Sequence, residues 1–301
     1  MSQSESSLIV LETDDVRVEL LARRGGKITS LFDTSRGREW LVQAERELAG
    51  APDTTVPYDE GDLCGWDEMM PTIEACRLPG TDRVLPDHGE LWRTPWEVSG
   101  RTASSVTTVV RSDLGYRFER TLTLDANVLT VDYCVVGTGA GPVEYLWAAH
   151  PFVVLAPDTR LYLDGAHDVT EAGDDGTQRI EWPVDGFRVA KNVEEGSGRK
   201  LFARATEDSV GVSLVDEDGA RLTWRWSASD APWLGLWLDH ASLSRHLVAA
   251  IEPTTSGEDS LEVSSLRGQS MTIAPEEVRQ WRISVEVGEG RPDKEEVSWA
   301  S

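Results

Sequence analysis

Short segments rich in β-branched and aromatic residues recur along nearly the whole chain, and turn residues separate them. Several of them, such as residues 222–226 and 281–285, alternate apolar and polar side chains with the period of two of a half-buried strand. Helical periodicity is hard to find, and residues 38–48 are the best short candidate for a helix. The pattern predicts an antiparallel all-β protein, with strands at residues 16–21, 105–111, 116–124, 128–136, 145–155, 210–215, 221–226, 233–238, 246–251 and 280–287.

The length of 301 residues fits one large β-sandwich or barrel, because such folds reach this size as a single unit. We therefore expect one domain over residues 1–301, with a frayed, charged tail from about residue 288. Residues 51–95 differ from the rest, being rich in Pro, Gly and Asp with little periodicity. The tryptophans and cysteines within this stretch indicate an ordered, functional loop.

The chain carries 53 acidic and 29 basic residues, a formal net charge of −24. This charge repels phosphate backbones and anionic lipids, so nucleic acid and membranes are poor partners and a neutral small molecule fits better. No stretch is long and apolar enough for a signal peptide or a membrane span, which predicts a cytoplasmic protein. Cys64, Cys76 and Cys134 lack metal-ligand spacing, and we expect neither a metal nor a cofactor. No sequence feature sets an oligomeric state.

A first candidate site residue, His88, follows a Pro-Asp turn, with Asp87 before it and Trp92 soon after. A solvated turn histidine is the commoner explanation of such a motif. Trp92 and Trp96 favour a ligand site instead, because large amphipathic rings beside polar donors suit the faces of sugars. We therefore keep His88 as a candidate.

A second candidate, His150, lies within the apolar run of residues 145–155. A buried histidine must be hydrogen-bonded, so a core histidine satisfied by a backbone carbonyl explains the run equally well. Pro151 removes a ladder donor, which predicts a bulge or an edge position for the strand at this point. A bulge there would turn His150 toward a site.

The third candidate, Glu252, follows five apolar residues and precedes Pro253 and two threonines, which are expected to end the strand. Partial burial would raise the pKa of Glu252 and make it a usable general base near neutral pH. A strand-end glutamate pointing to water is the alternative.

Motifs of other enzyme classes are missing from the sequence: it holds no nucleotide-binding glycine loop, zinc-protease helix or nucleophile elbow. Asp67, Glu68 and Glu74 could supply the paired carboxylates of a glycosidase. Nothing in the sequence sets their separation, and a solvated loop is the simpler interpretation.

Taken in order, these segments resemble the aldose 1-epimerase (galactose mutarotase-like) family from about residue 15 to residue 287. Residues 18–31 and 37–41 look like the family's opening strands. The region from residue 65 to residue 89 is similar to its first-histidine region, His150-Pro151-Phe152 to its second-histidine strand, and Ile251-Glu252-Pro253 to its terminal glutamate strand.

The resemblance implies a large, twisted antiparallel β-sandwich, the galactose mutarotase-like supersandwich, with a sugar cleft on one curved sheet. It also implies an activity, the interconversion of the α and β anomers of a sugar by ring opening. In that reaction Glu252 would act as the general base on the anomeric hydroxyl, and His150, as imidazolium, would protonate the ring oxygen. His88 would hold a sugar oxygen.

Sugar-binding positions follow less directly from the resemblance. The family commonly places an arginine before the first histidine and an aspartate on a strand before the glutamate. Arg77 is the best candidate for the arginine, while aromatic rings stand where the aspartate is expected. Asp87, Trp92, Trp96 and Trp237 complete the predicted binding set, and at least one tryptophan among Trp66, Trp92, Trp96 and Trp237 is expected to line the cleft.

Two alternatives remain open at this point. One is a non-catalytic carbohydrate-binding protein on the same scaffold, although binding alone would not need an acid and a base together. The other is an epimerase of sugar phosphates, which would need arginines at the cleft to bind phosphate, and for which Arg77, Arg83 and Arg93 are available.

Overall fold

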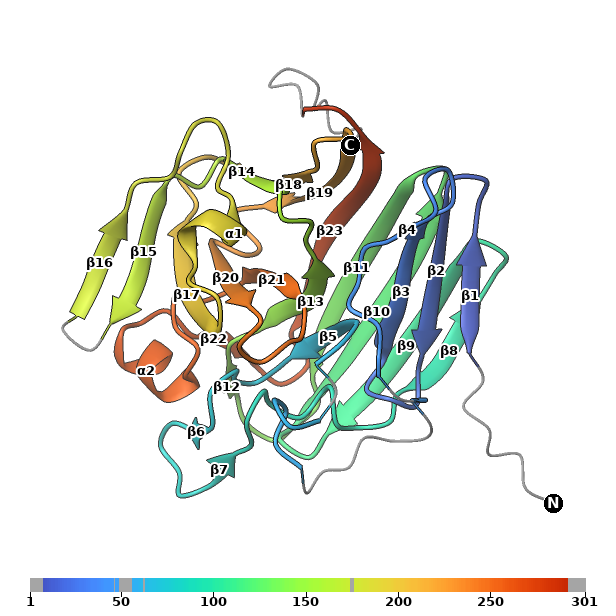
Figure 1. Cartoon of the computed structure of the whole chain (residues 1–301). Coiled ribbons are helices and arrows are strands. Elements are labelled where there is room, and N and C mark those ends of the chain that lie inside the picture. The colour runs from blue at the N-terminus through green and yellow to red at the C-terminus, as the bar shows by residue number, and fades with distance from the viewer. Residues whose placement is uncertain (1–7, 46, 49–55, 62, 174–175, 292–301) are drawn as a thin grey trace.

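Two large antiparallel β-sheets pack face to face in the computed structural model, which describes residues 8–45, 47–48, 56–61, 63–173 and 176–291 (Figure 1). Within these residues the larger sheet has eleven strands. Its order is β1 (Ile9–Glu12), β2 (Val16–Leu21), β3 (Lys27–Asp33), β5 (Trp66–Met69), β13 (Ala148–Val154), β21 (Leu247–Thr254), β20 (Trp233–His240), β17 (Ser197–Arg204), β15 (Asp168–Gly173) and β16 (Gly176–Ile180), with β4 (Arg38–Glu39) paired to β3.

The second sheet has eight strands among the described residues. Its order is β14 (Arg160–Asp164), β18 (Ser209–Val215), β19 (Ala220–Ser227), β23 (Val278–Glu289), β11 (Val128–Gly137), β10 (Tyr116–Asp125), β9 (Ser105–Ser112) and β8 (Glu97–Arg101). The remaining elements are small: the pairs β12 (Val143–Tyr145) with β22 (Met271–Ile273) and β6 (Cys76–Arg77) with β7 (Val84–Leu85), and the helices α1 (Val189–Asn192) and α2 (Leu261–Leu266).

The predicted all-β antiparallel sandwich is confirmed, and most predicted strands match observed ones to within a few residues. The segment 145–155 is divided, since β12 ends at Tyr145 and β13 begins at Ala148. A frayed tail from residue 288 was expected, but β23 continues through Glu289, and residues 292–301 lie outside the described residues.

The weak helix candidate at residues 38–48 is not helical at its described residues, 38–45 and 47–48. Residues 38–39 form strand β4, and Leu41 makes an isolated bridge to Val153. The Glu39 carboxylate accepts hydrogen bonds from the backbone N–H groups of Leu31 and Leu41, both across 2.9–3.0 Å. These bonds satisfy donors of an extended chain, so tertiary contacts override the weak helical pattern.

Both faces of the central strands of the larger sheet are covered. One apolar cluster fills the space between the two sheets, and a second covers the opposite face around Met69, Phe152, Val248 and Ala250. A strand buried on both faces reads as a continuous apolar run rather than an alternation. This double burial explains the unbroken apolar sequences of β13 and β21.

Strand β5 corrects the expectation of a solvated loop around Asp67 and Glu68, because both side chains are fully buried. Glu68 points between the sheets, where its Oε1 accepts hydrogen bonds from Arg120 and Tyr133, each at 3.0 Å, and its Oε2 accepts one from Trp147 Nε1 at 3.1 Å. Because Arg120 lies on β10 and Tyr133 on β11, the Glu68 carboxylate links the two sheets.

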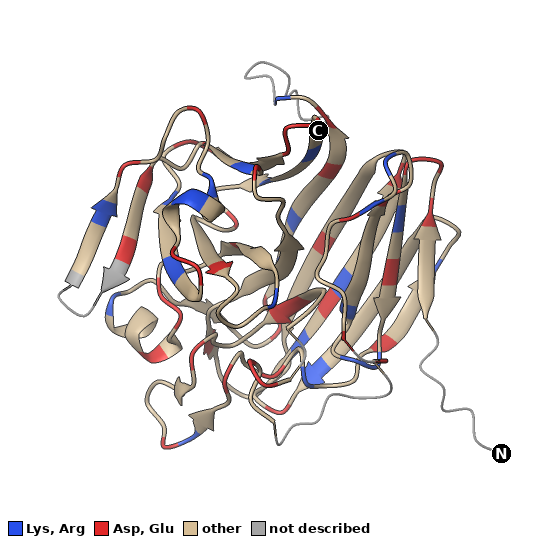
Figure 2. Ribbon diagram, in the orientation of Figure 1, with Lys and Arg blue, Asp and Glu red and all other residues tan. Residues whose placement is uncertain are grey.

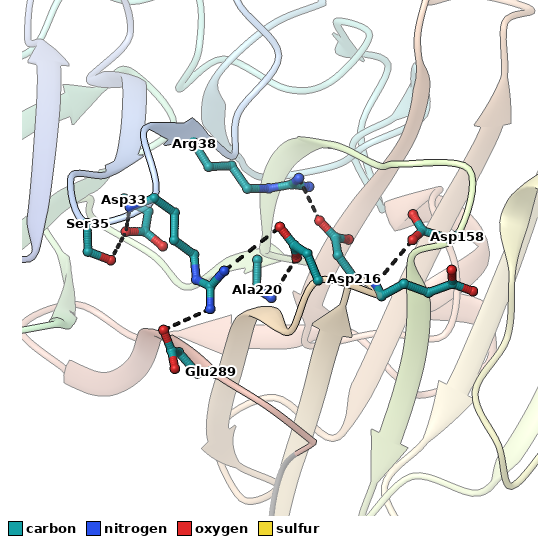
Figure 3. Close-up of polar contacts among 10 residues, drawn as sticks. Asp33, Ser35, Arg38, Asp158, Asp216, Ala220 and Glu289 are labelled. Carbon is teal, nitrogen blue, oxygen red and sulfur yellow. Dashed lines mark hydrogen bonds and ion pairs between the residues drawn. The ribbon is translucent and has the colours of Figure 1, made fainter.

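Ion pairs join the two sheets at one end of the sandwich (Figure 3). Arg38 of β4 pairs with Asp216 across 2.6 Å, and Arg36 pairs with Glu289 of β23 across 2.8 Å. Elsewhere, Asp and Glu are spread over strands and loops throughout the molecule rather than gathered on one face (Figure 2). Among the described residues, no helix is long and apolar enough to cross a membrane.

Candidate active site

Three titratable side chains lie in one row across adjacent strands of the larger sheet. The ladder between β5 and β13 pairs Asp67 with His150. The pairs Ala148–Thr254 and Phe152–Ala250 set the register between β13 and β21, which places His150 opposite Glu252. Side chains at paired positions lie on the same face of a sheet, so Asp67, His150 and Glu252 all face away from the inter-sheet core.

The sequence predicted either an edge position or a bulge for the strand that carries His150. Strand β13 is not at an edge, because β5 and β21 flank it on either side. Its pairing with β21 is interrupted between Ala148 and Phe152, although the register is the same on both sides of the gap. Pro151, which lacks a backbone N–H, lies within this gap. The ladder opens at His150, but no register shift accompanies the gap, so the predicted bulge is absent as well.

Glu252 lies inside β21 rather than at its end, and it is fully buried. Its Oε1 lies 3.7 Å from Nε2 of His150, and its Oε2 lies 2.6 Å from Nζ of Lys200. Nζ of Lys200 also lies 2.9 Å from Oδ1 of Asp259. Oε1 of Glu252 has no hydrogen-bond partner among the described residues, which is uncommon for a buried carboxylate oxygen.

His88 reaches the same place from the loop that follows β7. Its Nδ1 lies 2.8 Å from Oδ2 of Asp87, and its ring stacks on Tyr58 with centroids 4.1 Å apart. The centroids of the His88 and His150 rings are 5.5 Å apart. The backbone of His88 has a φ of +56°, and the next residue, Gly89, has a φ of +69° where a Cβ would lie 2.3 Å from the carbonyl oxygen of Met70. This tight turn therefore requires glycine at position 89 and directs His88 toward the sheet.

Tyr58 closes the site on the side of β5. Its hydroxyl donates to Oδ2 of Asp67 across 3.1 Å, and its ring meets His150 edge-on at 5.7 Å. Lys27 of β3 forms a fully buried ion pair with the same Asp67. Two ion pairs, Lys27–Asp67 and Lys200–Glu252, thus lie on either side of His150.

A cleft of about 680 Å³, a size typical of small-molecule sites, reaches this row at His150, while Asp67 and Glu252 are fully buried beside it. Loops and sheet both contribute to its lining. Its residues are Pro57, Tyr58, Asp59, Glu60, Leu63, Ile73, Glu74, Ala75, Asp87, His88, His150, Phe152, Lys200, Trp237, Leu243 and Asp259.

Of the residues named from the sequence, His88, His150, Asp87, Glu74 and Trp237 line the cleft. Glu252 does not line it but is buried behind His150, with Oε1 3.7 Å from Nε2. The cleft thus has a tryptophan in its wall, Trp237, at the position where the resemblance led us to expect an aspartate.

Three predicted binding residues lie elsewhere. Arg77 is exposed on β6 and pairs with Asp82 across 3.4 Å. Trp92 is buried beneath Tyr58, edge-on at 4.9 Å, and Trp96 is buried in the inter-sheet core against the guanidinium of Arg120. Trp66 is also fully buried. Tryptophan is amphipathic, so its position in the sequence beside a site does not decide whether the ring faces ligand or core.

Sequence reasoning missed Lys200, Asp259 and Tyr58. Lys200 and Tyr58 come from segments 52 and 194 residues away from Glu252 along the chain, by their numbers in the sequence. The sequence feature that could have pointed to Lys200 was its place before Leu201 and Phe202 in a strand-like segment. That pattern is common on half-exposed strands and does not indicate a site.

Comparison with known proteins finds the same architecture in solved structures. No protein-family model and no curated protein matches the chain. Solved structures do match over nearly its whole length. They include a galactose mutarotase related enzyme from Lactobacillus acidophilus (TM-score 0.72, 16% identity, 95% of this chain and 100% of that one) and a galactose mutarotase-like protein from Lactobacillus casei (0.71, 17%, 94% and 100%). An aldose epimerase homologue from C. elegans matches at 0.70 with 15% identity, over 95% of this chain and 100% of that one.

The chain has the galactose mutarotase-like fold. The predicted fold is therefore confirmed, whereas identities of this size leave the chemistry to be argued from the site itself.

Within the cleft region, burial and neighbouring charges set the pKa values of His150 and Glu252. Burial, then the neighbouring His88 and Lys200, lowers the pKa of His150 well below its ordinary value. Burial raises the pKa of Glu252, and the ammonium of Lys200 opposes that rise. Although burial acts against it, the carboxylates of Asp259 and Glu252 raise the pKa of Lys200, which is therefore a fixed positive charge.

Proposed function

We propose that this protein is an aldose 1-epimerase-like isomerase that interconverts the α and β anomers of an uncharged sugar. The observation that supports this most is the pair His150 and Glu252, opposed across adjacent strands, with His150 lining a cleft of small-molecule size and Glu252 buried next to it. A carboxylate oxygen without a hydrogen-bond partner and an imidazole lie within a few ångströms of each other. Base and acid must act on two different oxygens of one small ring, and this spacing suits that task.

Ring opening in this cleft would proceed by two proton transfers. Oε1 of Glu252 takes the proton of the anomeric hydroxyl, the C1–O bond of the ring breaks, and its electron pair leaves with the ring oxygen. His150 gives its proton to that oxygen. Rotation of the resulting aldehyde exposes its other face, and the reverse transfers close the ring as the other anomer. His88, held by Asp87 and Tyr58, is placed to contact a sugar oxygen.

The low pKa of His150 makes its imidazolium a strong acid but a scarce one near neutral pH. A ring oxygen is a weak base, and an imidazolium destabilised by burial and by Lys200 is a stronger acid than an exposed one. The proton-bearing His150 is then a minor species in the free enzyme, so the pH dependence should report both members of the pair.

The charge of the cleft favours an uncharged sugar over a sugar phosphate. Among the described residues, its lining includes five carboxylates, while Lys200 already pairs with two acidic groups. No arginine lines this part of the described structure, so the bidentate contacts that typically hold phosphate are missing. Trp237 offers an indole face against which the C–H groups of a sugar can pack.

Exchange NMR between the two anomers tests the proposal, because it measures interconversion at equilibrium. A panel of aldoses should be compared with their 6-phosphates at equal concentration, each with a spontaneous background. We expect exchange proportional to enzyme concentration for at least one unphosphorylated aldose, and much slower exchange for its phosphate. Sugar binding without exchange above background would instead identify a carbohydrate-binding protein, and preference for a phosphate would contradict the charge argument.

A further inference from the structure

We propose that Lys200 is a positioning residue of this site: it holds Oε2 of Glu252, which leaves Oε1 to act beside His150, and its charge favours the ionised carboxylate. This inference rests on the proposed function, since it concerns how the base of that reaction is prepared. Lys200 lines the cleft, and the role proposed for it is exerted through its contact with Glu252.

The geometry of three adjacent strands carries the argument. Strand β20 lies between β17, which carries Lys200, and β21, which carries Glu252. Gly235 of β20 pairs with Glu252 on one side and with Phe202 on the other. A Cβ at position 235 would lie 2.9 Å from Oε2 of Glu252. The missing side chain therefore leaves room for the carboxylate to lie across β20 and meet the ammonium.

Three contacts hold the ammonium of Lys200. Nζ lies 2.6 Å from Oε2 of Glu252 and 2.9 Å from Oδ1 of Asp259, and it lies over the ring of Phe202 at 5.2 Å from the centroid. The side chain is only 17% exposed, so water competes weakly for these contacts. Because Oε2 is occupied by Lys200, Oε1 is the oxygen left beside His150, 3.7 Å from its Nε2.

The charge of Lys200 acts on both members of the catalytic pair. An ammonium this close favours the ionised form of Glu252 and disfavours the ionised form of His150. The other charged or titratable groups that act on this pair come from four further places. They are Lys27 on β3, Asp67 on β5, His88 after β7 and Asp259 after β21. Removing Lys200 should therefore raise both pKa values, whereas a loss of packing alone would move neither in a defined direction.

The test uses Lys200→Met, which keeps much of the length of the side chain and removes its charge. Arg199→Met is the matched control: Arg199 is the preceding residue of β17, and its ion pair with Glu171, at 2.7 Å, does not involve the residues that line the cleft. Lys200→Arg restores the charge with a different shape. Circular dichroism and thermal unfolding identify variants that fold.

The first measurement is the pH profile of kcat/KM for anomer exchange. In Lys200→Met we expect both limbs to move to higher pH, by about one to three units for the limb that reports Glu252. The profile of Arg199→Met should match that of the wild-type protein, and Lys200→Arg should bring the limbs back toward it. A lower rate with both limbs in place would overturn the proposal.

The second measurement does not depend on activity. NMR titration of the ring of His150 in the free protein should show a higher pKa in Lys200→Met than in wild type, and no change in Arg199→Met. If the wild-type protein anomerises no sugar, the proposed function fails, and this titration still decides whether Lys200 controls the pair. If anomerisation occurs but the pKa of His150 is the same with and without Lys200, the inference about Lys200 fails alone.

Discussion

Replacing Glu252 by Gln should remove the base of the proposed reaction while preserving the shape of the site. The amide oxygen can still accept from Lys200, where Oε2 now lies at 2.6 Å. The amide NH₂ group then occupies the position of Oε1, facing His150, and cannot take a proton. General bases commonly contribute about 10²–10⁴-fold to rate, so kcat/KM should fall at least about a hundredfold, or about 2.7 kcal/mol of transition-state stabilisation.

The effect of Glu252→Gln on stability should be smaller than its effect on rate. The substitution turns a hydrogen bond between two charged groups into one with a neutral acceptor, a difference of about 1 kcal/mol. Lys200 keeps its second carboxylate partner, Asp259, at 2.9 Å, so no buried ammonium is left unpaired. Relief of the desolvation of Glu252 offsets part of this loss, because the carboxylate is fully buried.

Anomer exchange by NMR measures the rate and urea unfolding measures the stability of Glu252→Gln, with Glu262→Gln on the exposed face of helix α2 as the control. Spontaneous exchange must be subtracted, because it continues without enzyme. A folded Glu252→Gln protein with nearly full activity would show that Glu252 is not the base, and the mechanism would fail even though the fold stands.

Substitutions at Gly235, Trp237 and Glu68 give three further tests. Gly235→Ala should reduce kcat/KM by about tenfold or more with normal far-UV circular dichroism, because its Cβ would displace the Glu252 carboxylate; unchanged kinetics would contradict the account of Lys200 and Glu252. A bound sugar should change tryptophan fluorescence in wild type but much less in Trp237→Phe, since Trp237 lines the cleft; an equal response in both would place the sugar elsewhere. Burial, opposed by the hydrogen-bond donors of Glu68, raises the pKa of this carboxyl from 4.5 to about 7. The free energy of unfolding of the wild-type protein, relative to that of Glu68→Gln, should therefore decrease as the pH rises through this range. An equal difference between the two proteins at pH 4.5 and pH 8, measured by urea unfolding, would refute this prediction.

The pH dependence of the difference in the free energy of unfolding between the wild-type protein and Glu68→Gln is set by the proton that Glu68 binds. Below pH 4.5 the Glu68 carboxyl is protonated in both the folded and the unfolded chain. Between 4.5 and about 7 the unfolded chain releases its proton while the folded chain retains it, which favours unfolding as the pH rises. The stabilisation that comes from the raised pKa of Glu68 is therefore fully present below pH 4.5, and it is lost as the pH rises through about 7.

Much of the fold could be read from local patterns. Strands such as β10 and β11 alternate buried and half-buried residues along ten positions each, and that alternation is written in the sequence. The helix expected at residues 38–48 failed where the pattern was weak and where Glu39 bonded to a neighbouring strand. Strand β5 was hidden in an irregular stretch because it has only four residues, all of them buried.

The chain alone determined the class of fold and singled out two residues, His150 and Glu252, that the structure brings together in the candidate site. His150 and Glu252 each interrupt an apolar run that a doubly buried strand requires, and a titratable group in such a run is visible without a structure. Whether each faced the core or a cleft was left open, since a histidine bonded within the core produces the same sequence.

Tertiary structure decided which residues surround that pair. The strand order β5-β13-β21-β20-β17 brings together segments that are far apart in the chain, and Lys200 reaches Glu252 only because Gly235 leaves the intervening strand bare. Trp92 and Trp96 turned inward while Trp237 faced the cleft, although all three have the same side chain. Strand neighbours and loop contacts are non-local, and no periodicity within one segment encodes them.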